Sequence, residues 1–176
     1  MRKAAWLCVL ALALAVPAMA QDEHPRAEAF GGYSYVRVSD QGTSVNLNGG
    51  SGSISVNPNH WLGLVADFGG YHFNQSGVSG SVITYLFGPK IAFRGERVTP
   101  FAQALFGGAH ISVPIGSSSA SENAFAMALG GGLDVKVAQH FAVRLIQAEY
   151  LMTKFNDGAN NRQNNARISA GIVVRF

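Results

Sequence analysis

The chain has 176 residues and a formal net charge of +3; 48% of its residues are hydrophobic, 13% are charged and one is a cysteine. This length suits one domain. The sequence has no run of basic residues and so does not support nucleic-acid binding. Beyond residue 20, no segment reaches the ~18 consecutive apolar residues of a membrane-spanning helix. Many glycines and aromatic residues with few charges are typical of a small β-barrel or an exported β-sandwich.

The first 20 residues have the pattern of a cleavable signal peptide. Met1-Arg2-Lys3 is a short cationic head, and residues 4–16 are apolar but too few to span a bilayer. Pro17 interrupts that run before Ala18-Met19-Ala20, which is an A-x-A cleavage site. We therefore expect cleavage after Ala20, a short periplasmic lead-in over residues 21–27, and a barrel domain over residues 28–176.

Cleavage would change the charge and the cysteine content of the chain. Without Arg2 and Lys3, the 13 basic residues fall to 11 against 10 acidic ones, which gives a net charge of +1. Cys8 lies in the segment that is removed. The mature chain is therefore expected to have neither a disulfide nor a thiolate nucleophile.

Beyond the lead-in, apolar residues alternate with small or polar ones, which is the period of a β-strand. The last eleven residues, Ala166 to Phe176, alternate in this way and end on an aromatic residue. At ~3.3 Å per residue and a tilt of ~45°, such a segment rises about 25 Å, the height of the apolar band of an outer-membrane barrel. The pattern predicts eight strands, at about residues 28–38, 51–57, 61–73, 81–94, 98–113, 122–137, 140–153 and 166–176.

Two of these segments are expected to be irregular. Pro89 cannot donate a ladder hydrogen bond, so we expect a bulge or a local break there. In the seventh segment, Gln147 and Glu149 have the opposite parity to Arg144. A single bulge near Leu145–Ile146 would return these polar side chains to one face.

The connections between the predicted strands alternate in length. Longer polar connections follow the odd strands, at 39–50, 74–80, 114–121 and 154–164, and short turns follow the even ones. Outer-membrane barrels have long external loops, short periplasmic turns and an even number of strands. The alternation therefore favours an all-β, eight-stranded antiparallel up-and-down transmembrane barrel over a soluble sandwich.

The two faces of such a barrel should differ in chemistry. Aromatic residues assigned to the outward set fall mostly toward strand ends, where aromatic girdles belong: Tyr33, Tyr35, Tyr71, Tyr85, Phe87, Phe93, Phe101, Phe106, Phe125, Phe141 and Phe176. Four acids and six bases are assigned to the lumen: Glu28, Asp67, Lys90, Arg94, Asp134, Lys136, Arg144, Glu149, Arg167 and Arg175. Buried charges must be paired, and eight strands leave room for little but side chains. We therefore expect a plugged, hydrogen-bonded lumen with at most a tiny, gated conductance.

Several stretches together resemble the OmpA/OmpX-like family of eight-stranded outer-membrane barrels. They are Phe30-Gly31-Gly32-Tyr33-Ser34-Tyr35, Trp61-Leu62-Gly63-Leu64-Val65-Ala66-Asp67, Thr99-Pro100-Phe101-Ala102, Gly130-Gly131-Gly132-Leu133-Asp134 and the terminal Val174-Arg175-Phe176. The resemblance implies a place in the bacterial outer membrane, in contact with its lipid and lipopolysaccharide, and surface ligands for the loops. It also implies folding by the outer-membrane assembly machinery, which in this family reads a C-terminal aromatic residue, here Phe176. No peptidoglycan-binding domain follows the barrel in this sequence, so a cell-wall tether is not supported.

One short motif could carry catalysis. His110-Ile111-Ser112, with Glu122 beyond the next loop, is similar to the His-x-Ser arrangement of outer-membrane lipid A deacylases. In that arrangement the serine is the nucleophile, the histidine the base and the acid an orienting group. His110 and Ser112 both have the parity of the lipid face. A three-residue match arises easily by chance, however, so an interfacial histidine and a loop-edge serine are the preferred reading.

No motif indicates a cofactor or a metal. Gly130-Gly131-Gly132 is not followed by a helix, the residues around Asp157 lack EF-hand spacing, and the five histidines lack metal-ligand spacing. The sequence therefore predicts a non-enzymatic outer-membrane protein with a structural, adhesion or surface-interaction role. The alternatives are a lipid-modifying enzyme using His110 and Ser112, and a narrow gated pore.

Overall fold

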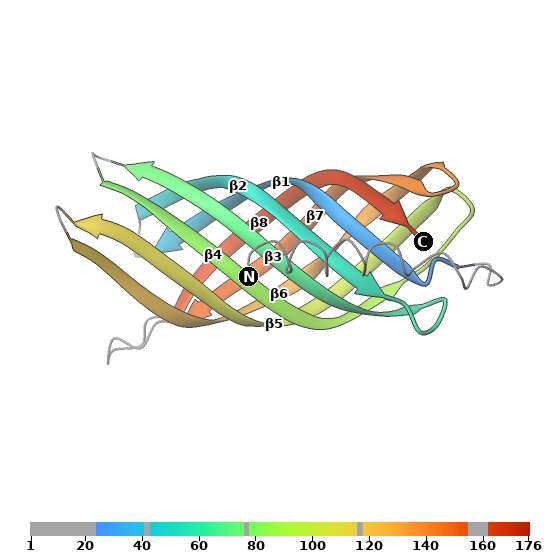
Figure 1. The fold of residues 1–176 in the computed structure, drawn as a ribbon, viewed down its shortest axis with the longest axis horizontal. Coiled ribbons are helices and arrows are strands. Elements are labelled where there is room, and N and C mark those ends of the chain that lie inside the picture. Colours follow the sequence, from blue (N-terminus) through green and yellow to red (C-terminus); the bar gives the residue numbers. More distant parts are fainter. Residues whose placement is uncertain (1–23, 41–42, 76–77, 116–117, 155–161) are drawn as a thin grey trace, which may run out of the picture.

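The computed structural model describes residues 24–40, 43–75, 78–115, 118–154 and 162–176. These residues form one sheet of eight antiparallel strands that closes on itself, because the first strand pairs with the last (Figure 1). The strands are β1 (Ala27–Asp40), β2 (Thr43–Val56), β3 (Leu62–Gln75), β4 (Val78–Ala92), β5 (Val98–Ile115), β6 (Ser118–Ala138), β7 (Phe141–Lys154) and β8 (Arg162–Arg175). The predicted eight-stranded up-and-down barrel is confirmed. Within the described ranges there is no helix of the length and hydropathy needed to cross a membrane.

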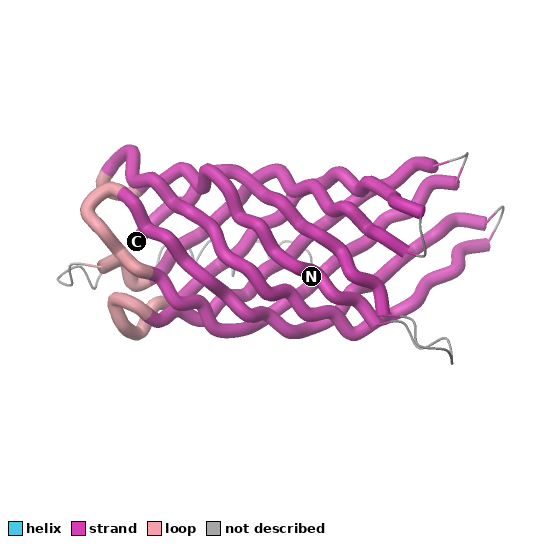
Figure 2. The backbone as a smooth tube through the Cα atoms, turned by 180° about the vertical axis from the view of Figure 1, so that it is seen from behind, coloured by secondary structure: helices cyan, strands magenta, loops and turns pink. Residues whose placement is uncertain are grey.

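The two ends of the barrel carry different connections. Residues 57–61, 93–97 and 139–140 join strands at the end where β1 begins and β8 finishes, which we call the terminal end (Figure 2). At the opposite end, which we call the distal end, the described strands stop at residues 40, 75, 115 and 154 and resume at residues 43, 78, 118 and 162. The predicted signal peptide with its cleavage site at Ala20, and the loop around Asp157, lie outside the described residues.

The predicted loop lengths at the distal end are wrong. The segments assigned to loops at 39–50, 74–80 and 114–121 are mostly strand, and β2 begins at Thr43 instead of Ser51. Asn46 and Asn48 of this stretch pair with Arg37 and Tyr35 of β1. Glycine, asparagine and serine disfavour strands in isolation, but in a closed sheet the neighbouring strands supply every ladder hydrogen bond. As a result, the β3–β4 and β5–β6 hairpins extend past the ends of β1 and β2 (Figure 1).

The predicted bulge in the seventh strand is confirmed. Asp134 of β6 pairs with Arg144, while its neighbour Leu133 pairs with Ile146, so Leu145 is an extra residue in β7. The register with β8 shifts at the same place. Leu145 and Ile146 are consequently both exposed, and Arg144 and Gln147 are both buried.

Proline 89 causes a local break without a bulge. Pro89 pairs with Leu64 of β3. The ladder between β4 and β5 passes from Phe87↔Phe106 to Lys90↔Gln103 without a change of register. The break fits the missing backbone donor of proline.

The outer surface of the sheet is apolar and the lumen is packed. Exposed large side chains such as Leu64, Phe87, Leu129 and Ile172 face outward, as a lipid-facing surface requires. Two clusters of buried apolar side chains lie in the lumen: one has Phe30, Ala142 and Val173, and the larger has Val36, Leu47, Val65, Tyr71, Leu86, Leu105, Ala109, Ala126, Ala128 and Leu151. Tyr71 and Phe101, both predicted to face lipid, are only 3% and 6% exposed. Their positions keep the inward parity of Asp67 and Gln103, so the backbone turns these two rings into the lumen.

Paired glycines lie where the barrel closes. Gly32 of β1 is opposite Gly171 of β8. A Cβ atom on Gly32 would collide with the carbonyl oxygen of Ala170, and one on Gly171 with that of Gly31. A Cβ atom on Gly31 would meet nothing within 4 Å. The closing pair of strands therefore relies on glycine at these facing positions.

Candidate functional site

The middle of the lumen is organised by one arginine and two carboxylates. Arg167, which is fully buried, donates from Nε to Glu149 Oε2 at 2.6 Å and from Nη1 to Asp67 Oδ1 at 2.7 Å. Its Nη1 is also 3.2 Å from the hydroxyl oxygen of Tyr71. Strands β3, β7 and β8 thus contribute to a single bonded group. This group and its neighbours, which we call the central cluster, are Asp67, Tyr71, Gln103, Gln147, Glu149 and Arg167.

Two glutamines complete the shell of Glu149. Gln103 Nε2 donates to Oε1 and Gln147 Nε2 donates to Oε2, each at 2.8 Å. With the bond from Arg167, both carboxylate oxygens have partners, so the burial cost of this charge is offset by charge-assisted hydrogen bonds. The bulge in β7 is what brings Gln147 and Glu149 to the same face as Arg144.

The lumen near the terminal end holds a second group of charges. Lys90 Nζ lies 2.5 Å from Glu28 Oε2, and Arg175 Nε lies 3.3 Å from Glu28 Oε1. Arg94 Nη2 is 3.8 Å from Glu28 Oε2, and its Nη1 donates to the carbonyl oxygen of His60. Burial lowers the pKa of Arg94, against the raising effect of Glu28. The residues of this second group, which we call the terminal cluster, are Glu28, Lys90, Arg94, Asp134, Arg144 and Arg175.

Arg144 connects the two clusters. Its Nε and Nη2 atoms donate to the two oxygens of Asp134, at 2.7 and 3.0 Å, and its Nη1 donates to Gln147 Oε1 at 2.6 Å. The guanidinium carbon is 4.3 Å from the centroid of the Phe30 ring and 4.4 Å from that of Phe101. Such cation–π contacts are strongest where water is excluded, which explains why Phe101 belongs inside the barrel.

Serines fill the lumen where β1 meets both of its neighbours. The hydroxyl of Ser34 lies 2.5 Å from that of Ser51 and 2.6 Å from that of Ser169, and all three side chains are buried. These serine contacts link β1, β2 and β8 inside the lumen.

Nine of the ten charges assigned to the lumen lie in the two clusters. Lys136 was assigned wrongly: it has the inward parity, opposite Ala142, but lies close to the terminal end and is exposed. Tyr71, Gln103, Phe30 and the serines also belong to the network, although they were not among the residues predicted to line the lumen. Strand parity alone would have found Tyr71, Phe30, Ser34 and Ser169, because each shares a strand face with a predicted lumen charge. Gln103 and Ser51 lie on strands that carry no predicted lumen charge, so parity relative to a charge could not have found them.

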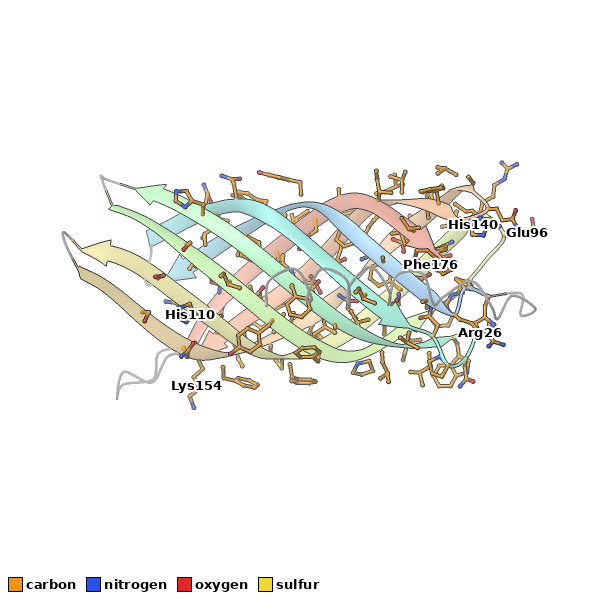
Figure 3. The ribbon with its side chains drawn as sticks, viewed as in Figure 1. Arg26, Glu96, His110, His140, Lys154 and Phe176 are labelled. Carbon is orange, nitrogen blue, oxygen red and sulfur yellow. The ribbon has the colours of Figure 1, made fainter. Side chains whose placement is uncertain are left out.

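Of the His110, Ser112 and Glu122 motif, the structure describes the side chains of His110 and Ser112. His110 and Ser112 have the outward parity of β5, opposite the exposed residues Ile83 and Ser81 of β4. His110 lies toward the distal end of the barrel (Figure 3). His110 Nδ1, however, is 2.8 Å from Asn123 Oδ1. Glu122 lies opposite Ile111 in the register, and its side chain lies outside the described residues. No group of three or more acidic, histidine or cysteine side chains suited to a metal ion is found among the described residues.

Polar pairs mark the distal edge of the apolar surface. Tyr33 donates to Asn48 at 2.6 Å and Tyr35 to Asn46 at 2.7 Å. Tyr150 donates to Asn164 on β8. Tyrosine is enriched at membrane interfaces, where one side of the ring is in lipid and the hydroxyl is wet. These pairs therefore indicate where the hydrocarbon ends.

The comparisons with known proteins agree with this architecture. The sequence model of the outer membrane protein beta-barrel domain family matches residues 6–176. No curated protein sequence has a significant match to the chain.

Three solved structures share the fold at low sequence identity. The neisserial surface protein A (NspA) has a TM-score of 0.70 and 16% identity, covering 88% of this chain and 100% of its own. The attachment invasion locus protein Ail of Yersinia pestis, in complex with the heparin analogue sucrose octasulfate, has a TM-score of 0.63 and 21% identity. That match covers 87% of this chain and 99% of the Ail chain. The N-terminal β-barrel domain of OprF from Pseudomonas aeruginosa has a TM-score of 0.56 and 15% identity. That match covers 88% of this chain and 100% of the OprF domain. The chain belongs to the outer membrane protein β-barrel family and is a protein of the bacterial outer membrane.

Proposed function

We propose that this barrel is not an enzyme and that it serves membrane integrity and surface interactions, with its lumen closed by its own side chains. The observation that carries the proposal is the bonding inside the lumen. The ion-paired side chains of both clusters are at most 9% exposed. A pore needs a continuous water path, and catalysis needs a reactive group that substrate can reach. Groups committed to one another in a narrow eight-stranded lumen provide neither.

The proposed orientation places the terminal end in the periplasm and the distal end outside the cell. Outer-membrane barrels have short turns on the periplasmic side and long extensions outside the cell, and the strands of the β3–β4 and β5–β6 hairpins extend past β1 and β2 at the distal end (Figure 1). The proposed partners are outer-membrane lipid around the apolar surface and lipopolysaccharide at the tyrosine–asparagine edge. Phe176, which is exposed beside Ala27, is the proposed contact for the assembly machinery.

The plugged lumen predicts almost no conductance in planar bilayers. Neutralising Arg144 together with Asp134, as Arg144→Met with Asp134→Asn, should open small steps by removing the link between the clusters. The measurement is single-channel recording of the purified protein at low and high salt. Steady conductance from the unmodified protein would contradict the plug. The exposed variant Lys136→Gln should leave the trace unchanged.

The surface role is proposed to involve an anionic, sulfated ligand at the distal end. The fold is similar to that of Ail, which was solved with a sulfated heparin analogue. Exposed cationic side chains in this chain include Arg37 and Lys154 near the distal end. Lys154 and His110 lie at the same end of the barrel (Figure 3). Charge of this kind would attract sulfate groups from outside the cell.

Cells that carry the protein should bind immobilised heparin more than cells without it. The double variant Arg37→Gln with Lys154→Gln should lower the bound fraction by about threefold or more at low salt, since it removes two charges that face the ligand. Arg97→Gln, which removes an exposed charge at the terminal end, should have no effect. Equal binding by all strains would refute a sulfated surface ligand.

The second candidate function is lipid modification by His110 and Ser112. It is favoured only by their shared outward face near the membrane edge, where a lipid headgroup could reach them. The bond between His110 and Asn123 occupies the ring nitrogen that an orienting acid would need.

We expect the lipid A acylation profile to be the same with and without expression of the protein. The measurement is mass spectrometry of extracted lipid A, with Ser112→Ala as the control variant. Loss of an acyl chain that depends on Ser112 would establish the enzyme and overturn the non-catalytic role.

A further inference from the structure

The terminal cluster contains more positive than negative charge. Its four cations, Lys90, Arg94, Arg144 and Arg175, share the carboxylates of Glu28 and Asp134. Three of the cations, Lys90, Arg94 and Arg175, are directed at Glu28, and Arg175 is also 3.9 Å from Asp134. The six side chains are between 2% and 9% exposed, so water screens them poorly. Buried charge without compensation is costly. The six residues of the terminal cluster carry a formal charge of +2, and with the −1 of the central cluster, which is bonded to it through Arg144, the lumen network carries +1.

The excess charge coincides with unused hydrogen-bond donors. Arg94 Nε and Nη2 are buried and have no hydrogen-bond partner among the described residues. Arg175 Nε and Glu28 Oε1 also lack a hydrogen bond, but they face each other at 3.3 Å as an ion pair. The Nη1 atom of Arg94 is occupied by the carbonyl oxygen of His60, so the free donors form one edge of the guanidinium. Arg94 Nη2 is 3.8 Å from Glu28 Oε2, which is beyond hydrogen-bond distance.

We propose that the terminal cluster binds a phosphate-class oxyanion at the free edge of Arg94, with Lys90 and Arg175 supplying the remaining positive charge. The Nε and Nη2 donors of a guanidinium match two oxygens of a phosphate group. A phosphate group carries ~1.5–2 negative charges, which is enough to offset the formal +1 of the lumen network and most of the +2 of the terminal cluster. Water could satisfy the donors, but it would leave the charge uncompensated.

The position of Arg94 gives such an anion a way in. Arg94 lies just beyond the last residue of β4, Ala92, in the turn before β5 at the terminal end. The residue is only partly buried as a whole, although its free donor atoms are buried. The carboxylate of Glu28 opposes an anion there, so the bound oxyanion and Glu28 compete for the same three cations. Removing the carboxylate should therefore strengthen anion binding.

The test is titration of the folded, purified protein with inorganic phosphate in an uncharged detergent, by calorimetry or phosphorus NMR. The unmodified protein should show saturable binding at millimolar phosphate or below. Arg94→Gln should weaken it about tenfold or more, because the bidentate contact is lost. Arg97→Gln, in the same turn but exposed, removes the same formal charge and should change it less than about twofold. Glu28→Gln should tighten binding.

Folding of each variant is checked by its mobility on unboiled gels; if Glu28→Gln does not fold, the Arg94 and Arg97 pair decides. Absence of saturable binding overturns the site, as does equal weakening by both arginine variants. A folded Glu28→Gln protein without tighter binding also overturns it. The same phosphate titration in lipid nanodiscs identifies the natural source of the anion. If phosphatidylglycerol discs prevent the binding of added phosphate and phosphatidylcholine discs do not, the site belongs to an anionic lipid headgroup. Equal titration in both assigns it to free phosphate.

Discussion

Replacing Arg167 with methionine should lower the free energy of unfolding of the barrel by about 3–5 kcal/mol. The guanidinium is fully buried and bridges Glu149 and Asp67, at 2.6 and 2.7 Å. Without it, two carboxylates remain in the lumen with no cation between them. The measurement is urea unfolding in phospholipid vesicles, followed by the fluorescence of Trp61, which is exposed on the barrel surface.

A neutral version of the central cluster separates the lost charge from the lost packing. The triple variant Arg167→Met, Asp67→Asn and Glu149→Gln should regain most of the stability, because no unpaired charge is left. Asp67→Asn alone leaves the pair of Arg167 and Glu149 intact and should cost less than the arginine variant. A loss of less than about 1 kcal/mol in Arg167→Met would show that the cluster does not hold the barrel together.

Arginine on the outer surface of the barrel should be costly in its middle and tolerated at its edge. Ile172 on β8 is opposite Gly31 and Val143, well inside the apolar surface. Val56 is the last residue of β2, at the terminal end. Both side chains are 58% exposed on the outer surface, so the two positions differ in their depth in the bilayer and not in how far they are buried in the protein. We expect Ile172→Arg to cost about 2–4 kcal/mol and Val56→Arg about 0–1 kcal/mol in vesicles.

The same pair of variants tests whether the outward face is in lipid. For a water-soluble sheet, arginine at either position would be close to neutral. Equal stability of Ile172→Arg and Val56→Arg in vesicles would therefore contradict the membrane-facing surface. Unfolding in detergent micelles, where the apolar layer adapts to the protein, should reduce the difference between the two.

Much of the fold could be predicted from alternation and charge. The strand count, the bulge at Leu145 and nine of the ten lumen charges follow from parity, since charge inside a lipid-facing sheet can only face the lumen. The lengths of the distal connections could not be predicted in this way. Residues 43–50 look like a loop because of their composition, but β1 and β3 hold them in the sheet.

The faces of two aromatic side chains were predicted wrongly, again because residue type was given more weight than position in the strand. Residue type suggested that Tyr71 and Phe101 belong to an outer girdle, whereas their parity points inward. The sequence could not show that Tyr71 meets Arg167 or that Phe101 covers Arg144, because these partners come from strands far apart in the chain. In a barrel of this kind, parity is a better guide to the face of a residue than its hydrophobicity.

The pairing of β1 with β8 has a consequence for biogenesis. The ring is complete only when a segment near residue 30 meets one near residue 171, so nearly the whole polypeptide must be present beforehand. A half-built sheet would expose unpaired backbone groups to hydrocarbon on both margins, which lipid does not tolerate. Insertion of this protein must therefore be concerted, and a chain that lacks its eighth strand should stay outside the bilayer altogether.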